Sequence, residues 1–139
     1  MDLAGAVGGT ENVADDSKYY AVYPKKTCAH LEALTFPEIN KIDTKAPCHE
    51  CGSTQENWLC IHCNGVFCGR YIKEHMMLHS LEKEHPLVLS FSDLSVWCYP
   101  CESYIDNPKL YNVKNLAHMD KFGDQLVWSY GQNVIDMKN

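Results

Sequence analysis

Short apolar runs, separated by turn residues, fill the middle of the chain and predict strands. Residues 57–61 form one such run, and residues 65–69 form a second that ends at a glycine. Residues 86–91 alternate as a strand does, residues 93–95 carry turn residues, and residues 96–99 resume the strand pattern. We therefore expect a sheet of short strands.

Two segments show helical rather than strand patterns. Residues 71–80 contain no glycine or proline, and they place His75 and His79 four positions apart, on one face of a helix. Pro108 is a typical first residue of a helix, and this helix is expected to end near Gly123. Short strands interleaved with two or three helices predict a small α+β fold.

The ends of the chain differ in composition from its middle. Residues 1–18 are rich in Gly, Ala, Asp and Asn without a periodic apolar pattern, which predicts a flexible arm. Every cysteine lies between Cys28 and Cys101, so this span defines the folded core. Residues 124–139 contain no candidate ligand and form either a packed appendage or a loose tail.

Composition and charge exclude several classes of function. The 139 residues suffice for one domain, and the formal net charge is −6. A protein that binds nucleic acid through its phosphates needs a basic stripe, whereas the densest basic spot here is the Lys25-Lys26 pair. No apolar run approaches the ~18–20 residues of a membrane span, and the N-terminus lacks the pattern of a secretory signal. We expect an intracellular protein without a nucleic-acid or membrane partner.

The eight cysteines and seven histidines indicate metal sites. In a secreted chain of this length, eight cysteines would form four disulfides, and this alternative remains; in an intracellular protein, thiols stay reduced and Cys/His clusters usually bind zinc. Three Cys-x-x-Cys pairs occur, namely Cys48/Cys51, Cys60/Cys63 and Cys98/Cys101. The other candidate ligands are Cys28, His30, Cys68, His75, His79 and His85. Twelve ligands fill three tetrahedral sites, so we expect the sheet and helices to be organised around three structural zinc ions.

Three further histidines are expected to lie at the surface. His49 and His62 are the intervening residues of Cys-x-x-Cys pairs, where side chains usually point outward. His118 belongs to the last helix, where a surface or helix-packing role is the simplest interpretation.

Strand alternation predicts a second face beside the metal sites. If Cys98 points toward a zinc ion, Trp97 and Tyr99 point to the opposite face. Two large exposed aromatic side chains would indicate a binding surface, whereas packing against the helices is the alternative. Arg70 follows Gly69, and its planar guanidinium suits a carboxylate, although it could be an ordinary solvated arginine.

A longer pattern connects the cysteine pairs. It consists of Cys48-His49-Glu50-Cys51, Trp58-Leu59-Cys60-Ile61-His62-Cys63, Cys68-Gly69-Arg70-Tyr71, His75, His79, His85-Pro86-Leu87 and Trp97-Cys98-Tyr99-Pro100-Cys101. This pattern resembles the UBP-type ubiquitin-binding zinc finger, a domain of ubiquitin-specific proteases and of a histone deacetylase. The resemblance covers residues 19–123, which it implies are the zinc finger domain.

The resemblance also implies how the ligands divide among three zinc ions. The first set is Cys28, His30, Cys98 and Cys101; the second is Cys48, Cys51, Cys68 and His75; the third is Cys60, Cys63, His79 and His85. Neighbouring histidines of one helix would thus bind different ions.

The resemblance implies a ligand as well, the free C-terminal Gly-Gly carboxylate of unanchored ubiquitin or a similar peptide C-terminus. The residues expected to bind it are Arg70, Tyr71, Trp97, Tyr99, Tyr104, Trp58, Asp93 and Gly69. A narrow aromatic slot would select glycine by excluding Cβ, and Arg70 with loop amides would bind the carboxylate. No candidate lies beyond Tyr104, so we expect the helix after Pro108 to be dispensable for binding. We also expect the chain to be a monomer.

An enzyme is the main alternative class. A zinc hydrolase keeps one coordination position open and a cysteine protease needs a spare thiol, whereas twelve ligands on three ions leave neither. We therefore expect a non-catalytic domain. The resemblance implies that its parent is a cytoplasmic deacetylase of histones or tubulin, itself a hydrolase, which links ubiquitin signals to aggresomes; the nucleus is a second expected location. A ubiquitin-specific protease is the alternative parent.

Overall fold

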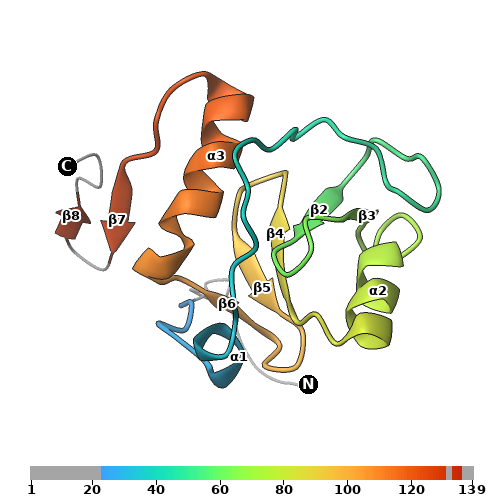
Figure 1. The fold of residues 1–139 in the computed structure, drawn as a ribbon, viewed down its shortest axis with the longest axis horizontal. Coiled ribbons are helices and arrows are strands. Elements are labelled where there is room, and N and C mark those ends of the chain that lie inside the picture. Colours follow the sequence, from blue (N-terminus) through green and yellow to red (C-terminus); the bar gives the residue numbers. More distant parts are fainter. Residues whose placement is uncertain (1–22, 131–132, 136–139) are drawn as a thin grey trace, which may run out of the picture.

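A five-stranded antiparallel sheet forms the centre of the molecule (Figure 1). The computed structural model describes residues 23–130 and 133–135, so the expected arm of residues 1–18 lies outside the described residues. In chain order the elements are α1 (Ala29–Glu32), β2 (Asn57–Cys60), β3 (Val66–Cys68), α2 (His75–Lys83), β4 (Leu87–Ser90), β5 (Val96–Cys98), β6 (Ser103–Ile105), η1 (Pro108–Leu110), α3 (Tyr111–Phe122), β7 (Trp128–Tyr130) and β8 (Asn133–Ile135). The expected α+β class is confirmed.

The strand order in the sheet is β3-β2-β4-β5-β6. Trp97 of β5 pairs with Val88 of β4 on one side and with Tyr104 of β6 on the other. Since paired residues of neighbouring strands share a face of the sheet, these three side chains lie on one face, and Cys98 lies on the other.

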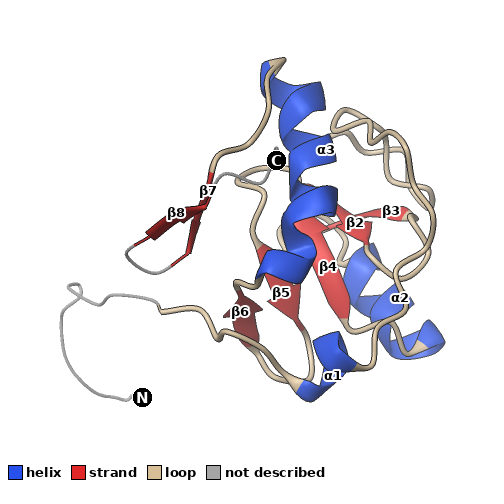
Figure 2. Ribbon diagram, turned by 60° about the vertical axis from the view of Figure 1, so that its left-hand side comes forward, coloured by secondary structure: helices blue, strands red, loops and turns tan. Residues whose placement is uncertain are grey.

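Each face of the sheet packs against a different helix. Leu87 and Leu89 of β4 belong to a core cluster that also contains Val113 and Ala117 of α3. Val88, between the two leucines, belongs to a second cluster that contains Met76 of α2 and Phe67 of β3. Figure 1 shows the sheet between α3 and α2, and Figure 2 shows α1 at one end of the sheet.

The second helix begins four residues later than the sequence predicted. Residues 70–73 form a turn, because the Gly69 carbonyl accepts hydrogen bonds from the N–H groups of Ile72 at 3.1 Å and Glu74 at 2.9 Å. Glu74 has a φ of +57°, and α2 starts directly after it at His75. The segment between Gly69 and His75 is therefore a compact loop.

The last helix contributes to the core. It starts with a 3₁₀ turn at Pro108, as expected of proline, and ends at Gly123, whose φ of +84° is typical of a glycine C-cap. Leu110, Val113 and Ala117 are buried in the cluster beneath it. The expectation that this helix is dispensable cannot be tested by truncation before Pro108, since that truncation would remove core side chains.

Two elements of the sheet region were not predicted from the sequence. The α1 helix spans only four residues, and β6 spans three, Ser103–Ile105. β6 pairs with β5. It also pairs with the segment that precedes α1, through a parallel bridge between Lys25 and Ile105.

The region after α3 packs back on the domain before it forms a small hairpin. The Leu126 N–H donates to Asn115 Oδ1 at 2.8 Å, and the Tyr111 hydroxyl donates to the Leu126 carbonyl at 3.2 Å. β7 and β8 then pair with each other, beside α3 in Figure 1. Of the two alternatives for this region, residues 124–127 favour the packed appendage. Among the described residues, no helix is both long and apolar enough to cross a membrane.

Replacing a core leucine of the central strand should destabilise the fold strongly. Leu89 is 0% exposed, so we expect Leu89→Ala to lower the free energy of unfolding by about 2–5 kcal/mol through lost burial and the cavity left behind. The control is Leu81→Ala on α2, where the side chain is 69% exposed and the change should stay below about 0.5 kcal/mol. Denaturant unfolding of zinc-loaded protein measures both, and equal effects would contradict this description of the core.

Candidate metal centres and binding face

Twelve cysteine and histidine side chains converge in three groups of four. In each group, the donor atoms all lie within 4.8 Å of one another. The groups are Cys28, His30, Cys98 and Cys101; Cys48, Cys51, Cys68 and His75; and Cys60, Cys63, His79 and His85. They are the three sets implied by the family resemblance, and together they contain every cysteine of the chain.

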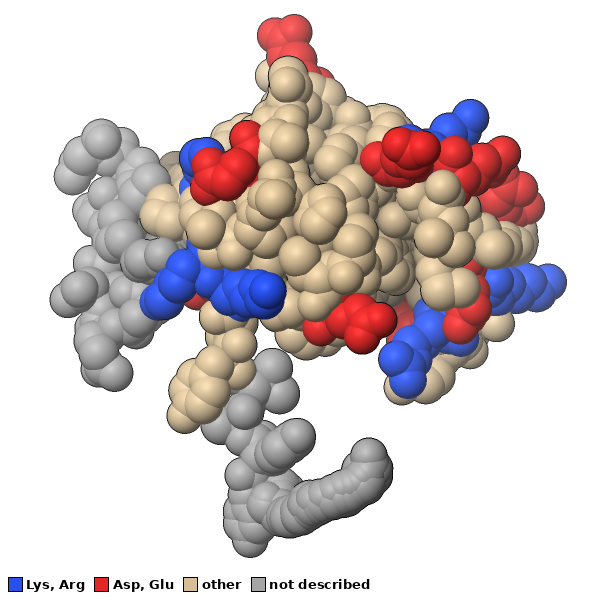
Figure 3. Space-filling model, turned by 90° about the horizontal axis from the view of Figure 1, so that it is seen from below, with Lys and Arg blue, Asp and Glu red and all other residues tan. Residues whose placement is uncertain are grey.

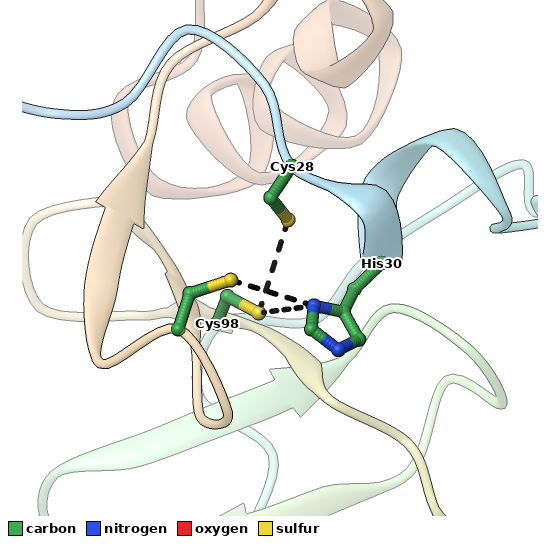
Figure 4. A group of neighbouring side chains, drawn as sticks. Cys28, His30 and Cys98 are labelled. Atoms are coloured by element: carbon green, nitrogen blue, oxygen red, sulfur yellow. Dashed lines mark hydrogen bonds between the residues drawn. The ribbon is translucent and has the colours of Figure 1, made fainter.

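The first group joins the start of the domain to its end (Figure 4). Cys28 directly precedes α1, and His30 lies within it, so one short helix presents both side chains to the end of β5. The His30 Nδ1 atom lies 3.4 Å from the Cys98 sulfur and 3.4 Å from the Cys101 sulfur. The Cys28 and Cys98 sulfurs are 3.9 Å apart.

The second group joins a loop to β3 and to the start of α2. The His75 Nδ1 atom lies 3.6 Å from the Cys48 sulfur and 3.5 Å from the Cys68 sulfur. The Cys51 and Cys68 sulfurs are 4.0 Å apart. Because His75 is the first residue of α2, this group determines where the helix begins relative to the sheet.

The third group joins β2, α2 and the segment before β4. His79 Nε2 lies 3.4 Å from the Cys63 sulfur, and His85 Nδ1 lies 3.4 Å from the Cys60 sulfur. The two ring nitrogens are 3.3 Å apart. Phe67 stacks on His79 with ring centroids 4.4 Å apart, which holds this imidazole in place.

These distances fit tetrahedral zinc. Zn–S and Zn–N bonds of about 2.3 and 2.0 Å imply tetrahedral edges of about 3.8 Å between sulfurs, about 3.5 Å between sulfur and nitrogen, and about 3.3 Å between nitrogens. The observed S–S distances are 3.9 and 4.0 Å, the S–N distances 3.4 to 3.6 Å, and the N–N distance 3.3 Å. Each group combines thiols and imidazoles without a carboxylate, which is the donor set of a structural zinc site.

The thiols differ in how their surroundings affect ionisation in the metal-free protein. At Cys48, burial is outweighed by backbone hydrogen bonds, which lower its pKa to about 6. Burial raises the pKa of Cys60 to about 12 and that of Cys98 to about 12. Such thiols keep their protons at neutral pH, whereas zinc binds the thiolate, so zinc binding must release protons. When bound, zinc supplies the positive charge that makes four thiolate or imidazole donors compatible with a buried position.

One histidine within a Cys-x-x-Cys pair differs from the expectation of surface exposure. His62 is half-buried, its Nε2 accepts a hydrogen bond from the Leu87 N–H at 3.0 Å, and it stacks on His85 with centroids 5.0 Å apart. Burial lowers the pKa of His62 to about 4, so the ring is neutral. His62 therefore supports a ligand of the third group. His49 is exposed, as expected.

The face of the sheet opposite Cys98 carries half-buried aromatic side chains. Trp97 and Tyr104 contact each other edge to face, with centroids 4.9 Å apart and an interplanar angle of 72°. Trp58, Trp97 and Tyr99 pack against the cluster that contains Met76. Burial raises the pKa of Tyr99 to about 12, so its hydroxyl stays protonated. These aromatic side chains are half-buried, so their inner sides pack against the core and their outer sides reach solvent.

The polar atoms of this face have no partner among the described residues. Arg70 and the ring N–H and hydroxyl groups of Trp58, Trp97, Tyr99 and Tyr104 make no hydrogen bond or ion pair within this part of the chain. In proteins, half-buried polar groups normally find partners in the protein or in water. The arrangement therefore offers several free donors to a ligand.

Arg70 lies in a loop that is held closely against the sheet. Its guanidinium carbon lies 5.0 Å from the centroid of the Tyr71 ring, and both residues are exposed. A Cβ atom at Gly69 would lie 2.6 Å from Glu56 Oε1 and 2.7 Å from Trp58 Nε1, so a larger residue there would require these side chains to move. Sequence reasoning did not identify Glu56, because nothing in its local pattern shows a contact with a loop 15 residues away.

Asp93 lies apart from this loop, at the exposed turn between β4 and β5. Its Oδ1 accepts hydrogen bonds from the Ser95 N–H at 3.1 Å and the Ser95 hydroxyl at 2.7 Å. Asp93 and Tyr104 line a cavity of about 570 Å³ together with Lys114 and His118 of α3. Tyr104 thus connects Asp93 to Trp97. The binding role of all eight candidate residues stays a prediction.

Surface charge is mixed rather than segregated. On the face shown in Figure 3, acidic and basic side chains are interspersed around an uncharged centre, without a continuous basic area.

Purified, folded protein should contain three zinc ions per chain. Because all twelve donors group into three tetrahedral sets, we expect metal removal by a chelator to abolish cooperative unfolding, and zinc to restore it. Elemental analysis with circular dichroism measures both. One or two zinc ions in a fully folded, monodisperse sample would show that at least one group is not a zinc site.

Comparison with known proteins identifies relatives of this domain. The chain is similar to Histone deacetylase 6 of Caenorhabditis elegans, with 43% identity over 114 residues that cover 82% of this chain and 12% of the relative. It is also similar to Ubiquitin carboxyl-terminal hydrolase 44 of Danio rerio, with 39% identity over 82 residues that cover 58% of this chain and 12% of the relative. The chain therefore spans only a small part of both proteins.

A solved structure and a protein family match the same region. An essential yeast splicing factor shares the fold, with a TM-score of 0.53 and 23% identity over 65% of this chain and 24% of that chain. Residues 48–110 match the family described as "Zn-finger in ubiquitin-hydrolases and other protein". This segment contains all the donors of the second and third groups, and the two cysteines that end the first. Residues 48–110 therefore match a UBP-type zinc finger.

Proposed function

We propose that this chain captures the free C-terminal Gly-Gly carboxylate of ubiquitin and is itself a binding module, not an enzyme. The observation that carries the proposal is the set of free donors on the aromatic face, beside the one arginine of the sequence. A ligand with a terminal carboxylate offers acceptor oxygens to these donors. The UBP-type family that residues 48–110 match supports ubiquitin as the source of that carboxylate.

Arg70 is the residue best suited to the carboxylate. Its guanidinium is exposed and has no ion pair among the described residues, so it can form two parallel hydrogen bonds with a planar anion. The Tyr71 ring beneath it adds a cation–π contact that restricts the side chain. A buried carboxylate without such a partner would be strongly disfavoured.

The aromatic side chains are suited to glycine. Trp97 and Tyr104 form one wall by their edge-to-face contact, and Tyr99 follows Trp97 after a single residue. A peptide that ends in Gly-Gly has no Cβ on its last two residues and can pass closely between flat rings. A substituted residue at either position would need a wider opening, so the slot provides specificity by exclusion.

The net negative charge of the chain suits the basic residues of the ubiquitin tail that precede its terminal glycines. The formal net charge is −6, and the tail of ubiquitin carries arginines before its glycines. Opposite charges speed association and suppress wrong partners more than they raise affinity. A monomer suffices for this mode of binding, because all candidate residues belong to one chain.

We further propose that the parent is a cytoplasmic histone or tubulin deacetylase that links ubiquitin to aggresomes. The 43% identity to Histone deacetylase 6 of Caenorhabditis elegans supports this parent. A ubiquitin-specific protease is the second candidate, supported by the 39% identity to Ubiquitin carboxyl-terminal hydrolase 44 of Danio rerio. Both parents would use the finger to bind the same ligand.

Calorimetric titration with ubiquitin tests the carboxylate directly. We expect Arg70→Ala to weaken binding by about 30- to 1,000-fold, the usual effect of removing a charge-paired arginine. Amide-capping the terminal glycine of ubiquitin should cause a similar loss with the wild-type chain. The control is Lys73→Ala, which removes another exposed cation of the same loop and should change affinity by less than about 3-fold.

Zinc content and melting temperature should be unchanged in both variants, since neither side chain is buried. If Arg70→Ala and amide-capped ubiquitin both bind within a few-fold of the native pair, capture of the carboxylate is wrong.

A further inference from the structure

We infer that Glu56 is a positioning residue that fixes Arg70 for the ligand carboxylate. This inference rests on the proposed function and adds a residue that does not itself contact the ligand. Both peptide neighbours of Arg70 are hydrogen-bonded to Glu56. The Gly69 N–H donates to the Glu56 carbonyl at 2.8 Å, and the Tyr71 N–H donates to Glu56 Oε1 at 3.0 Å.

These two hydrogen bonds hold the loop on either side of the functional side chain. The carbonyl bond continues the pairing between β2 and β3, in which Asn57 is opposite Cys68. The carboxylate bond extends it by two further residues, past the point where the strands end. Arg70 therefore starts from a backbone that is fixed before and after it, so less freedom is lost when its guanidinium binds an anion.

The close approach at Gly69 makes the carboxylate contact possible. Because the position of an absent Cβ is only 2.6 Å from Glu56 Oε1, any larger residue at 69 would push the carboxylate away from the Tyr71 N–H. Trp58 Nε1 lies 2.7 Å from the same point. The absence of a side chain at Gly69 therefore lets both Glu56 and Trp58 approach the loop.

Glu56 has a left-handed backbone conformation, with a φ of +48° that is costly for glutamate. Glu74, Glu84 and Glu102 share a positive φ, so the conformation by itself assigns no task. Glu56 is distinguished by its half-buried side chain, which accepts a hydrogen bond from a backbone N–H of the binding loop.

Two properties of Glu56, the length of its side chain and its negative charge, predict different effects on ubiquitin binding. Its oxygen orders the loop, whereas its negative charge lies near the site for an anionic ligand and opposes binding. Glu56→Gln keeps an acceptor oxygen at the same reach and removes the charge. Glu56→Asp keeps the charge and shortens the reach by one methylene.

Titration of these variants with ubiquitin separates the two properties. We expect Glu56→Gln to bind as well as wild type or better, and Glu56→Asp and Glu56→Ala to bind about 5- to 30-fold more weakly. Amide-capped ubiquitin should bind wild type and all three variants alike, because the loss concerns only the carboxylate. The Tyr71 amide should exchange hydrogen slowly in wild type and Glu56→Gln, and faster in Glu56→Asp.

The matched control is Glu84→Ala, which changes the same residue type at a similar φ of +58°, at the far end of α2. This variant should bind like wild type. Equal weakening by Glu56→Gln and Glu56→Asp, or wild-type binding by Glu56→Asp, would overturn the positioning role. If wild type itself does not distinguish free from amide-capped ubiquitin, the proposed function fails first, and the two failures are therefore distinguishable.

Discussion

The convergence of twelve cysteine and histidine donors into three groups is the constraint on which the rest of this structure depends. The strands of the sheet are three or four residues long and the first helix has four, so regular hydrogen bonding and core burial alone offer little stability. Each group joins segments that are far apart in the sequence. The first group connects Cys28 to Cys98 and thereby closes the whole domain, and the other two place α2 against β2 and β3.

This metal scaffold also positions the candidate binding face, because a strand directs neighbouring side chains to opposite sides. Cys98 belongs to the first metal group, while Trp97 points to the other face and contacts Tyr104. At the end of β3, Cys68 belongs to the second group and is followed directly by the loop of Arg70. Trp97 and Arg70 are each within two residues of a donor, and Tyr104 follows Cys101 by three residues. The metal groups therefore position the candidate binding face.

Much of the fold followed from the sequence, because cysteine spacing and apolar alternation are local signals. The segments around Trp58, Phe67, Leu89 and Trp97 are strands as predicted, and the last helix ends at its glycine. The predicted start of α2 was wrong, because the turn after Gly69 depends on hydrogen bonds within a folded loop. β6 is three residues long and depends on pairing with β5, and the contact of Glu56 with the Tyr71 N–H joins residues 15 apart. Such features arise from tertiary structure, for which no local pattern exists.

The central claim is that the zinc finger binds the C-terminal tail of ubiquitin and not its folded part. A nuclear magnetic resonance titration of ¹⁵N-labelled ubiquitin with the zinc-loaded chain tests this most directly. The account predicts saturable, one-to-one chemical shift changes that are largest at the last residues of ubiquitin and decline toward its folded part. Changes confined to the folded body, with the terminal glycines unaffected, would contradict it.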